Sequence, residues 1–260
     1  MSGYRLCQTK RAEIPYYIEN ISANIYAWEE LCYYIHHNIY LLDSTIINEE
    51  LCDWIRDELD LKQLYQKLYK VLEENQSLGD FILPIFKVNN YLTHEEFREL
   101  NNQLVRLEEQ PSVVRQKLKG DYLVEHKKYI NAIKVYRQAL VDVKDTNLGG
   151  QFIGGVYHNM GCAYMRMFLY EEALDCFRKT YEQVLTPAAL KTYLSAYAVT
   201  KPQEKYQQKL EDLQVEERLR TEIREELEQA RIQVPEGDSE EDIRALLDNL
   251  TREYHNSTGL

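Results

Sequence analysis

Two pairs of side chains in this sequence carry groups that could bind a metal ion. His158 and Cys162 are four residues apart, so a helix would place both of these zinc ligands on one face. A structural zinc site needs four ligands, and Cys176 is the only further candidate nearby. His36 and His37 are adjacent and would point in different directions on a helix. The sequence therefore predicts no metal site and favours surface or boundary positions for the adjacent histidines.

The glycine-rich run from Gly149 to Gly155 could in principle cradle a phosphate group. It lacks the Lys-Ser/Thr pair of a P-loop and does not follow a strand, so a helix boundary explains it better. Paired carboxylates are common in an acidic chain and indicate nothing without a pocket. No other combination of residues matches a nucleophile with its base. The sequence predicts a protein that is not an enzyme and that has no cofactor.

Composition indicates which elements must position any functional side chain. The chain has 260 residues but only 10 Gly and 6 Pro, too few for the many turns of a sandwich or barrel. Its strong hydrophobic periodicities are near 3.6 residues, which predicts an all-α protein with almost no sheet. No segment approaches the roughly 18 apolar residues of a membrane span. Residues 1–15 have no apolar run that would indicate a secretory signal.

The cysteines indicate the cellular compartment, and the net charge indicates which classes of partner are expected. The five cysteines lie far apart without a C-x-x-C pair, which indicates reduced thiols and a cytoplasmic protein. The net charge is −12, with −9 in residues 1–110, +4 in 111–200 and −7 in 201–260. Because an acidic chain repels phosphate groups, neither nucleic acid nor membrane is expected as a partner. The shifts in charge also predict the domain limits.

Residues 1–110 are predicted to form a helical unit whose type the sequence does not identify. A first helix from Trp28 to Leu42 has apolar residues on one face. Asn48 is a candidate N-cap, and Thr93 opens a capping box for a later helix. Residues 14–26 are expected to be extended or irregular. Two helices could be taken for a DNA-reading helix-turn-helix, but that segment is acidic, so ordinary helix packing is favoured.

A self-similar pattern of small and aromatic residues occupies residues 111–200. The series Gly120, Ala132 and Tyr136 recurs as Gly161, Ala173 and Phe177, with the same internal offsets of 12 and 4. Small residues let two helix backbones approach while an aromatic ring fills the space beside them. The residues expected to pack helix against helix are Gly120, Ala132, Tyr136, Ala139, Tyr157, Gly161, Tyr164, Ala173 and Phe177, with Phe168 on the face of Tyr164.

These segments resemble tetratricopeptide repeats, with Tyr157 in place of the usual Trp and Pro187 near the usual closing Pro. The resemblance implies helix pairs at 113–147 and 154–187 and a partial third pair at 188–200. The two repeat glycines are 41 residues apart instead of the family's usual spacing of about 34. A longer helix or a loop between Leu140 and Val156 must absorb the excess.

In this family the first helix of each pair faces the concave side, where a partner binds. The resemblance therefore implies a groove lined by Lys117, Asp121, Val124, His158, Asn159, Cys162, Met165, Arg166, Thr192 and Tyr193, with Ala196 beside them. The amide of Asn159 would suit the backbone of an extended peptide. Some family members clamp a terminal carboxylate; Lys117 and Asn159 fit that clamp, but Asp121, Ala189 and Tyr193 depart from it.

Two further segments follow the repeats. Residues 201–233 are predicted to form one long charged helix that caps the stack. Residues 234–260 are predicted to form a flexible joint at Pro235 to Gly237 and a short amphipathic helix that Ser239 and Asp242 cap. This tail helix could occupy the groove itself.

The favoured interpretation is a non-enzymatic adaptor that holds an extended peptide segment of another protein. Two alternatives remain open at this stage: a structural homo-oligomer subunit, in which the repeats pack against another copy, and a regulatory protein that senses a peptide.

Overall fold

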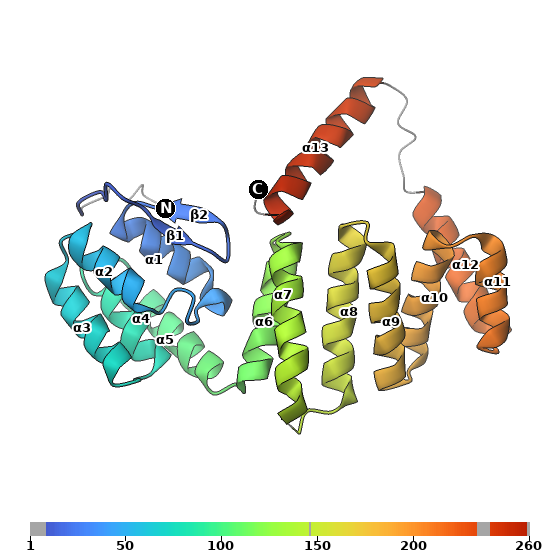
Figure 1. The fold of residues 1–260 in the computed structure, drawn as a ribbon, viewed down its shortest axis with the longest axis horizontal. Coiled ribbons are helices and arrows are strands. Elements are labelled where there is room, and N and C mark those ends of the chain that lie inside the picture. Colours follow the sequence, from blue (N-terminus) through green and yellow to red (C-terminus); the bar gives the residue numbers. More distant parts are fainter. Residues whose placement is uncertain (1–8, 146, 233–239, 259–260) are drawn as a thin grey trace. The chain divides into compact units, whose positions relative to one another are not determined.

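The computed structural model describes residues 9–145, 147–232 and 240–258 (Figure 1). Within these residues there are thirteen α-helices and a single two-stranded sheet, so the prediction of an all-α fold is confirmed. The chain divides into two compact units between Arg115 and Gln116, whereas the charge pattern predicted a limit after residue 110. Each unit buries its own set of apolar side chains.

The first unit begins with a small antiparallel hairpin of β1 (Tyr16–Ile18) and β2 (Ala23–Ile25). Five helices and a 3-10 turn follow it: α1 (Trp28–His37), η1 (Ile39–Leu41), α2 (Glu49–Asp57), α3 (Lys62–Glu73), α4 (Leu78–Phe86) and α5 (His94–Glu108). The prediction that the first helix continues to Leu42 is wrong. It ends at His37, and the side-chain amide of the following Asn38 donates to the Tyr34 carbonyl at 2.7 Å, which satisfies one terminal backbone acceptor.

Polar side chains cap α2, α4 and α5 in the first unit, and a tryptophan joins α1 to α4. The side chain of Asn48 accepts a hydrogen bond from the Leu51 N–H at 2.8 Å, and Thr93 forms the predicted capping box. The buried indole of Trp28 donates to the Ile85 carbonyl at 2.9 Å. This bond satisfies the only polar group of a large core side chain and links α1 to α4.

The second unit contains a row of antiparallel helices, which we call the helix stack (Figure 1). Its members are α6 (Ser112–Glu125), α7 (Tyr129–Asp142), α8 (Gly150–Arg166), α9 (Tyr170–Val184), α10 (Pro187–Thr200), α11 (Gln203–Asp212) and α12 (Glu217–Ile232). The excess residues before Gly161 are absorbed by the 3-10 turn η2 (Val143–Asp145), a loop and the early start of α8.

Aromatic rings pack directly on two helical glycines of the stack. A Cβ atom added to Gly161 would lie 2.8 Å from Cε1 of Phe177, and one added to Gly120 would overlap the ring of Tyr136. Tyr157 is half-buried, and the other predicted packing residues are buried. The expectation for Phe168 is wrong, because α8 ends at Arg166 and the chain turns at Phe168 with a φ of 60°.

The segment 201–233 contains two helices, which corrects the prediction of a single capping helix. Between α11 and α12, Gln214 adopts a left-handed φ of 49°. The guanidinium of Arg220 donates to the carbonyls of Val215 at 2.8 Å and Leu210 at 3.3 Å, so it satisfies backbone acceptors at the break. Tyr206 and Ile223 pack with Leu194 of α10 in one apolar cluster. Both helices therefore belong to the stack.

The outer side of α12 is polar, since Arg218, Arg224, Glu225 and Glu228 are exposed. The tail helix α13 (Glu240–Thr258) is longer than the short helix predicted. Glu253 of α13 forms an ion pair with Lys127, in the turn between α6 and α7. The predicted joint and the capping residue Ser239 lie outside the described residues.

Candidate partner-binding groove

The carboxylate of Asp121 binds side chains from three helices. It accepts hydrogen bonds from Lys117 Nζ at 2.6 Å, from the Tyr136 hydroxyl at 2.6 Å and from Asn159 Nδ2 at 2.7 Å. These donors lie on α6, α7 and α8, so the Asp121 cluster joins the first three helices of the stack. Burial and the bond to Asp121 raise the pKa of Tyr136, which keeps the phenol protonated as a donor.

The Asp121 cluster engages the two residues that were expected to meet a bound peptide. The amide nitrogen of Asn159 donates to Asp121, and the same carboxylate balances the charge of Lys117. A terminal carboxylate in a clamp would need these same donors. Asp121, which departs from the clamp pattern, therefore supplies an internal carboxylate where a clamp would bind the terminal carboxylate of its ligand. The geometry gives the cluster a role in joining helices.

The half-buried pair His158 and Cys162 lies one turn apart on α8, with Cys162 Sγ 3.8 Å from His158 Nε2. The His158 ring also contacts the ring of Phe177, with centroids 5.7 Å apart. Burial lowers the pKa of His158 and raises the pKa of Cys162, while Arg166 acts against the latter shift. Both groups are therefore neutral at pH 7, and a neutral thiol is a poor nucleophile.

In the described ranges, no group of three or more His, Cys, Asp or Glu side chains is placed to hold a metal ion.

On α10, one of the three residues predicted to line the groove lies elsewhere. Tyr193 was expected in the groove but is buried, with its ring 6.0 Å from that of Tyr197. The apolar side of α10, including Leu194, packs on α11 and α12 and so sets the rotation of the helix. The helical spacing of Thr192, Ser195 and Val199 is the sequence signal that could have found the correct face.

An open apolar depression of about 390 Å³ lies between α8, α9, α10 and α12. Its lining residues are Met165, Phe177, Lys191, Thr192, Ser195, Ala196, Val199, Glu226 and Leu227. Met165, Thr192 and Ala196 were predicted, whereas the two α12 residues were missed because that segment was interpreted only as a cap. Lys191 at the rim forms ion pairs with Glu222 and Glu226.

One stripe of α8 connects the Asp121 cluster to the apolar depression. Asn159, Cys162 and Met165 follow one another at spacings of three, so they share one side of the helix. Of the remaining predicted residues, Val124 is half-buried on α6, and Arg166 is exposed at the end of α8. The structure therefore brings together a polar cluster and an apolar depression along one line of side chains.

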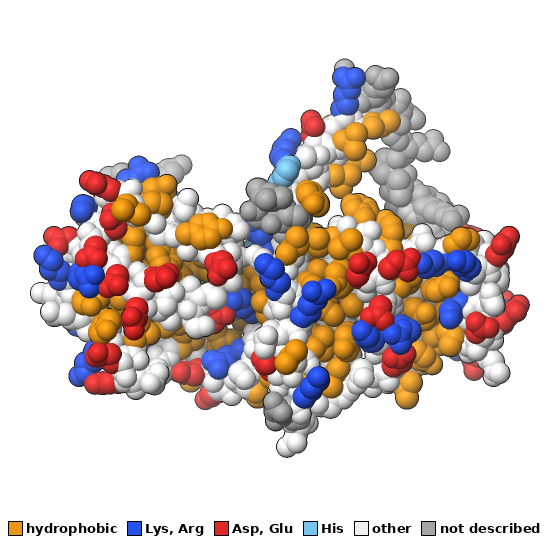
Figure 2. Space-filling model, viewed as in Figure 1, with side chains coloured by type: hydrophobic (Ala, Val, Ile, Leu, Met, Phe, Trp, Pro, Cys, Tyr) orange, Lys and Arg blue, Asp and Glu red, His pale blue; other side chains and the backbone are white. Residues whose placement is uncertain are grey.

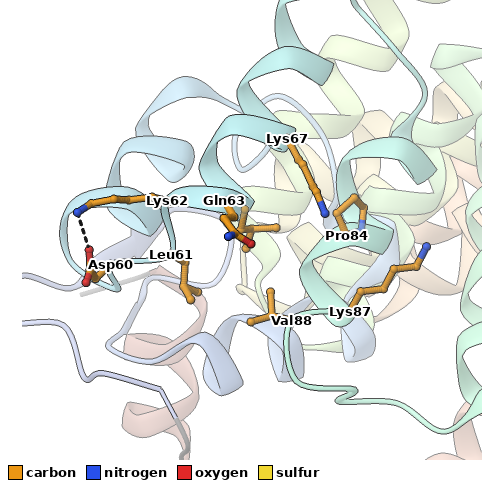
Figure 3. Close-up of a pocket in the computed structure, with 9 residues that line it drawn as sticks. Asp60, Leu61, Lys62, Gln63, Lys67, Pro84, Lys87 and Val88 are labelled. Atoms are coloured by element: carbon orange, nitrogen blue, oxygen red, sulfur yellow. Dashed lines mark ion pairs between the residues drawn. The ribbon is translucent and has the colours of Figure 1, made fainter.

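The first unit has a separate depression of about 440 Å³ between α3 and the end of α4 (Figure 3). Lys62, Lys67 and Lys87 surround it, and Lys62 pairs with Asp60 at 3.2 Å. All of its polar lining side chains are exposed, so its lysines are surface groups in an acidic unit. This depression offers no built site for a ligand.

No family model, curated protein or solved structure matches the chain. Within the part of the chain that the structure describes, no helix combines the length and apolar character needed to cross a membrane.

Proposed function

We propose that the second unit is a tetratricopeptide-like array that holds an extended segment of another protein and performs no chemistry itself. The observation that carries this proposal is the stripe of Asn159, Cys162 and Met165, which ends in the apolar depression. Stacked helix pairs bind partners along such continuous surfaces, because each pair contributes one face to the same groove. The raised pKa of the Cys162 thiol supports binding without nucleophilic catalysis by that residue.

The apolar depression supplies most of the binding energy in this proposal. Burying one Leu or Phe side chain of the partner contributes about 1.5–3 kcal/mol. The depression is open and mainly apolar, and Lys191 with its two carboxylates forms a polar rim. A partner segment with a large apolar anchor and polar neighbours fits this arrangement.

The Asp121 cluster has an indirect role in this proposal. It holds α6, α7 and α8 together through one carboxylate, so the groove surface is rigid before the partner arrives. Asn159→Ala then acts mainly through the loss of that rigidity. This differs from the expectation that Asn159 binds the peptide backbone directly.

Selection of displayed random peptides against the full chain tests the proposal. We expect the selected peptides to share a large apolar residue and to lose at least about tenfold in affinity with Val199→Asp, which puts a charge in the depression. The matched control is Val141→Asp: Val141 is 58% exposed and Val199 60%, and both lie near the end of a helix.

The control variant should bind the selected peptides with the parent's affinity. Equal losses in both variants, or none in either, would place peptide binding elsewhere. If no peptide is selected and the mass of the chain rises with concentration, the structural homo-oligomer alternative replaces the adaptor.

A further inference from the structure

The tail helix α13 presents an apolar side that nothing in the helix stack covers. Ile243, Leu246, Leu247 and Leu250 are between 39% and 58% exposed. Figure 2 shows apolar side chains gathered along α13. Outside this side the helix is mainly polar, with five carboxylates and two arginines between residues 240 and 258. An amphipathic helix of this kind is stable in water when its apolar side is covered.

One edge of the stack exposes an apolar surface of its own. The chain turns from α8 to α9 through Met167, Phe168 and Leu169, and Phe168 is 62% exposed. The ring of Tyr170 lies 6.2 Å from that of Phe168 in an edge-to-face contact. The turn from α6 to α7, which carries Lys127, lies on the same edge (Figure 1).

The part of this edge that meets Glu253 of α13 is positively charged, because it carries Lys127 and Arg166. The bond to Glu253 raises the pKa of Lys127, whereas the nearby positive charge of Arg166 lowers it. Two cations, Lys127 and Arg166, therefore lie near the carboxylate of Glu253. The ion pair between Lys127 and Glu253 already attaches the end of α13 to the edge. The charges of the helix and the edge are therefore complementary at this contact.

The spacing along α13 matches the spacing along the edge. Leu246, Leu250 and Glu253 are separated by four and three residues, so they share one side of α13. Leu246 lies about 10 Å from Glu253 along the helix axis. Neighbouring packed helices are about 8–10 Å apart, and the bond from Asn159 to Asp121 shows that α6 and α8 are direct neighbours.

We propose that the edge formed by the α6–α7 and α8–α9 turns is the docking surface of α13 from the same chain. Leu246 and Leu250 rest on Phe168 and Leu169, while Glu253 remains bound to Lys127. Residues 233–239 connect α12 to α13 and span at most about 25 Å when extended. A tether of this length holds α13 at an effective concentration of about 1 mM, which favours its own chain over a second copy at micromolar concentration.

Hydrogen exchange of the full chain tests this docking at the amides of residues 167–172. In Leu246→Ser/Leu250→Ser, we expect those amides to exchange at least about fivefold faster than in the parent, because their cover is lost. Asp248→Ser is the matched control, since Asp248 is exposed on the opposite side of α13. It should exchange at the parent's rate, and unchanged circular dichroism verifies that both variants fold.

Identical exchange in the parent and the double variant would overturn the proposal. Protection that grows with protein concentration, together with a dimer mass, would assign the surface to α13 of a second copy instead.

The ion pair provides a second test. Lys127→Ala and Glu253→Ala should each speed exchange at the edge, and the double variant should be no faster than the faster single variant. Additive effects would show that the two residues act separately and would overturn the proposed register. Val199→Asp should leave the exchange at residues 167–172 unchanged. If Leu246→Ser/Leu250→Ser instead speeds exchange at residues 195–199, which line the depression, α13 lies in the groove and the proposed edge is wrong.

Discussion

At the scale of single residues, aromatic rings of the helix stack pack directly against two glycines. The Phe177 ring leaves no room for a side chain at Gly161, because an added Cβ would approach it to 2.8 Å. At Gly155 of the same helix, the nearest atom to an added Cβ is Cε of Lys117 at 3.6 Å, an ordinary contact. In α8, close packing therefore requires glycine at position 161 but not at position 155.

We predict that Gly161→Ala lowers the free energy of unfolding by about 1–3 kcal/mol, since the added methyl group overfills the contact. Gly155→Ala should raise it by about 0.5–1 kcal/mol, because alanine is the better helix former and meets no obstacle. Urea denaturation followed by circular dichroism measures both. If Gly161→Ala is as stable as Gly155→Ala, the contact between α8 and α9 is not as close as the structure shows.

The packing of Gly161 on Phe177 could be predicted from local sequence spacing. The hydrogen-bond donors to Asp121 could not be predicted in this way. Gly161 and Phe177 follow from one repeated pattern within two consecutive helices. Asp121 could only be compared with the clamp pattern, which suggested repulsion of a ligand. Its actual donors include the hydroxyl of Tyr136, 15 residues away, and the amide of Asn159, 38 residues away. Such a cluster depends on how the helices meet.

Among the elements, the break between α11 and α12 is the clearest departure from the sequence pattern. No Gly or Pro lies between residues 203 and 232, so the segment was interpreted as one helix. Tertiary contacts override that preference. Val215 is buried next to the break, and the Arg220 guanidinium binds the carbonyls that the break exposes. Glu217 and Arg220 interrupt the apolar periodicity of the segment, and this interruption was the local sign of the turn.

The break predicts opposite effects for the same substitution at two glutamines. Gln214 has a left-handed φ, which glycine adopts without steric cost, so Gln214→Gly should stabilise the chain by up to about 1 kcal/mol. Gln208 is exposed within α11, where Gln208→Gly should cost about 0.5–1 kcal/mol. Urea denaturation of both variants gives the comparison. Destabilisation of similar size at both sites would mean that α11 and α12 form one continuous helix.

The rotation of α10 about its axis, which decides whether Tyr193 faces the groove, could not be predicted from the local sequence either. The sequence placed Tyr193 on the binding surface because the family pattern was continued from the preceding pair. The apolar residues of α10 instead turn toward α11 and α12, whose separate existence was not predicted. Two of the groove's lining residues, Glu226 and Leu227, were missed for the same reason.

At the scale of the whole molecule, the unfolding of the first unit can be followed separately by tryptophan fluorescence. The sequence has two tryptophans, Trp28 and Trp54, and both lie in the first unit. Their fluorescence therefore follows the first unit, while far-ultraviolet circular dichroism follows the helices of both.

We predict that Gly161→Ala moves the urea transition seen by circular dichroism to lower concentration and leaves the fluorescence midpoint unchanged, because each unit has its own core. Ile55→Ala, at a fully buried site of the first unit, should lower the fluorescence midpoint together with the first unit's part of the circular dichroism transition. A shift of the fluorescence midpoint in Gly161→Ala would mean that the units unfold as one.

The polar outer side of α12 affects whether a second molecule can add to that end of the helix stack. A repeat array with an apolar last face would accept the first helix of another molecule, and this head-to-tail contact would propagate into filaments. Here the contact would have to strip water from Arg218, Arg224, Glu225 and Glu228, and removing water from charged groups is costly. The polar outer side of α12 therefore disfavours head-to-tail addition of a second molecule at that end.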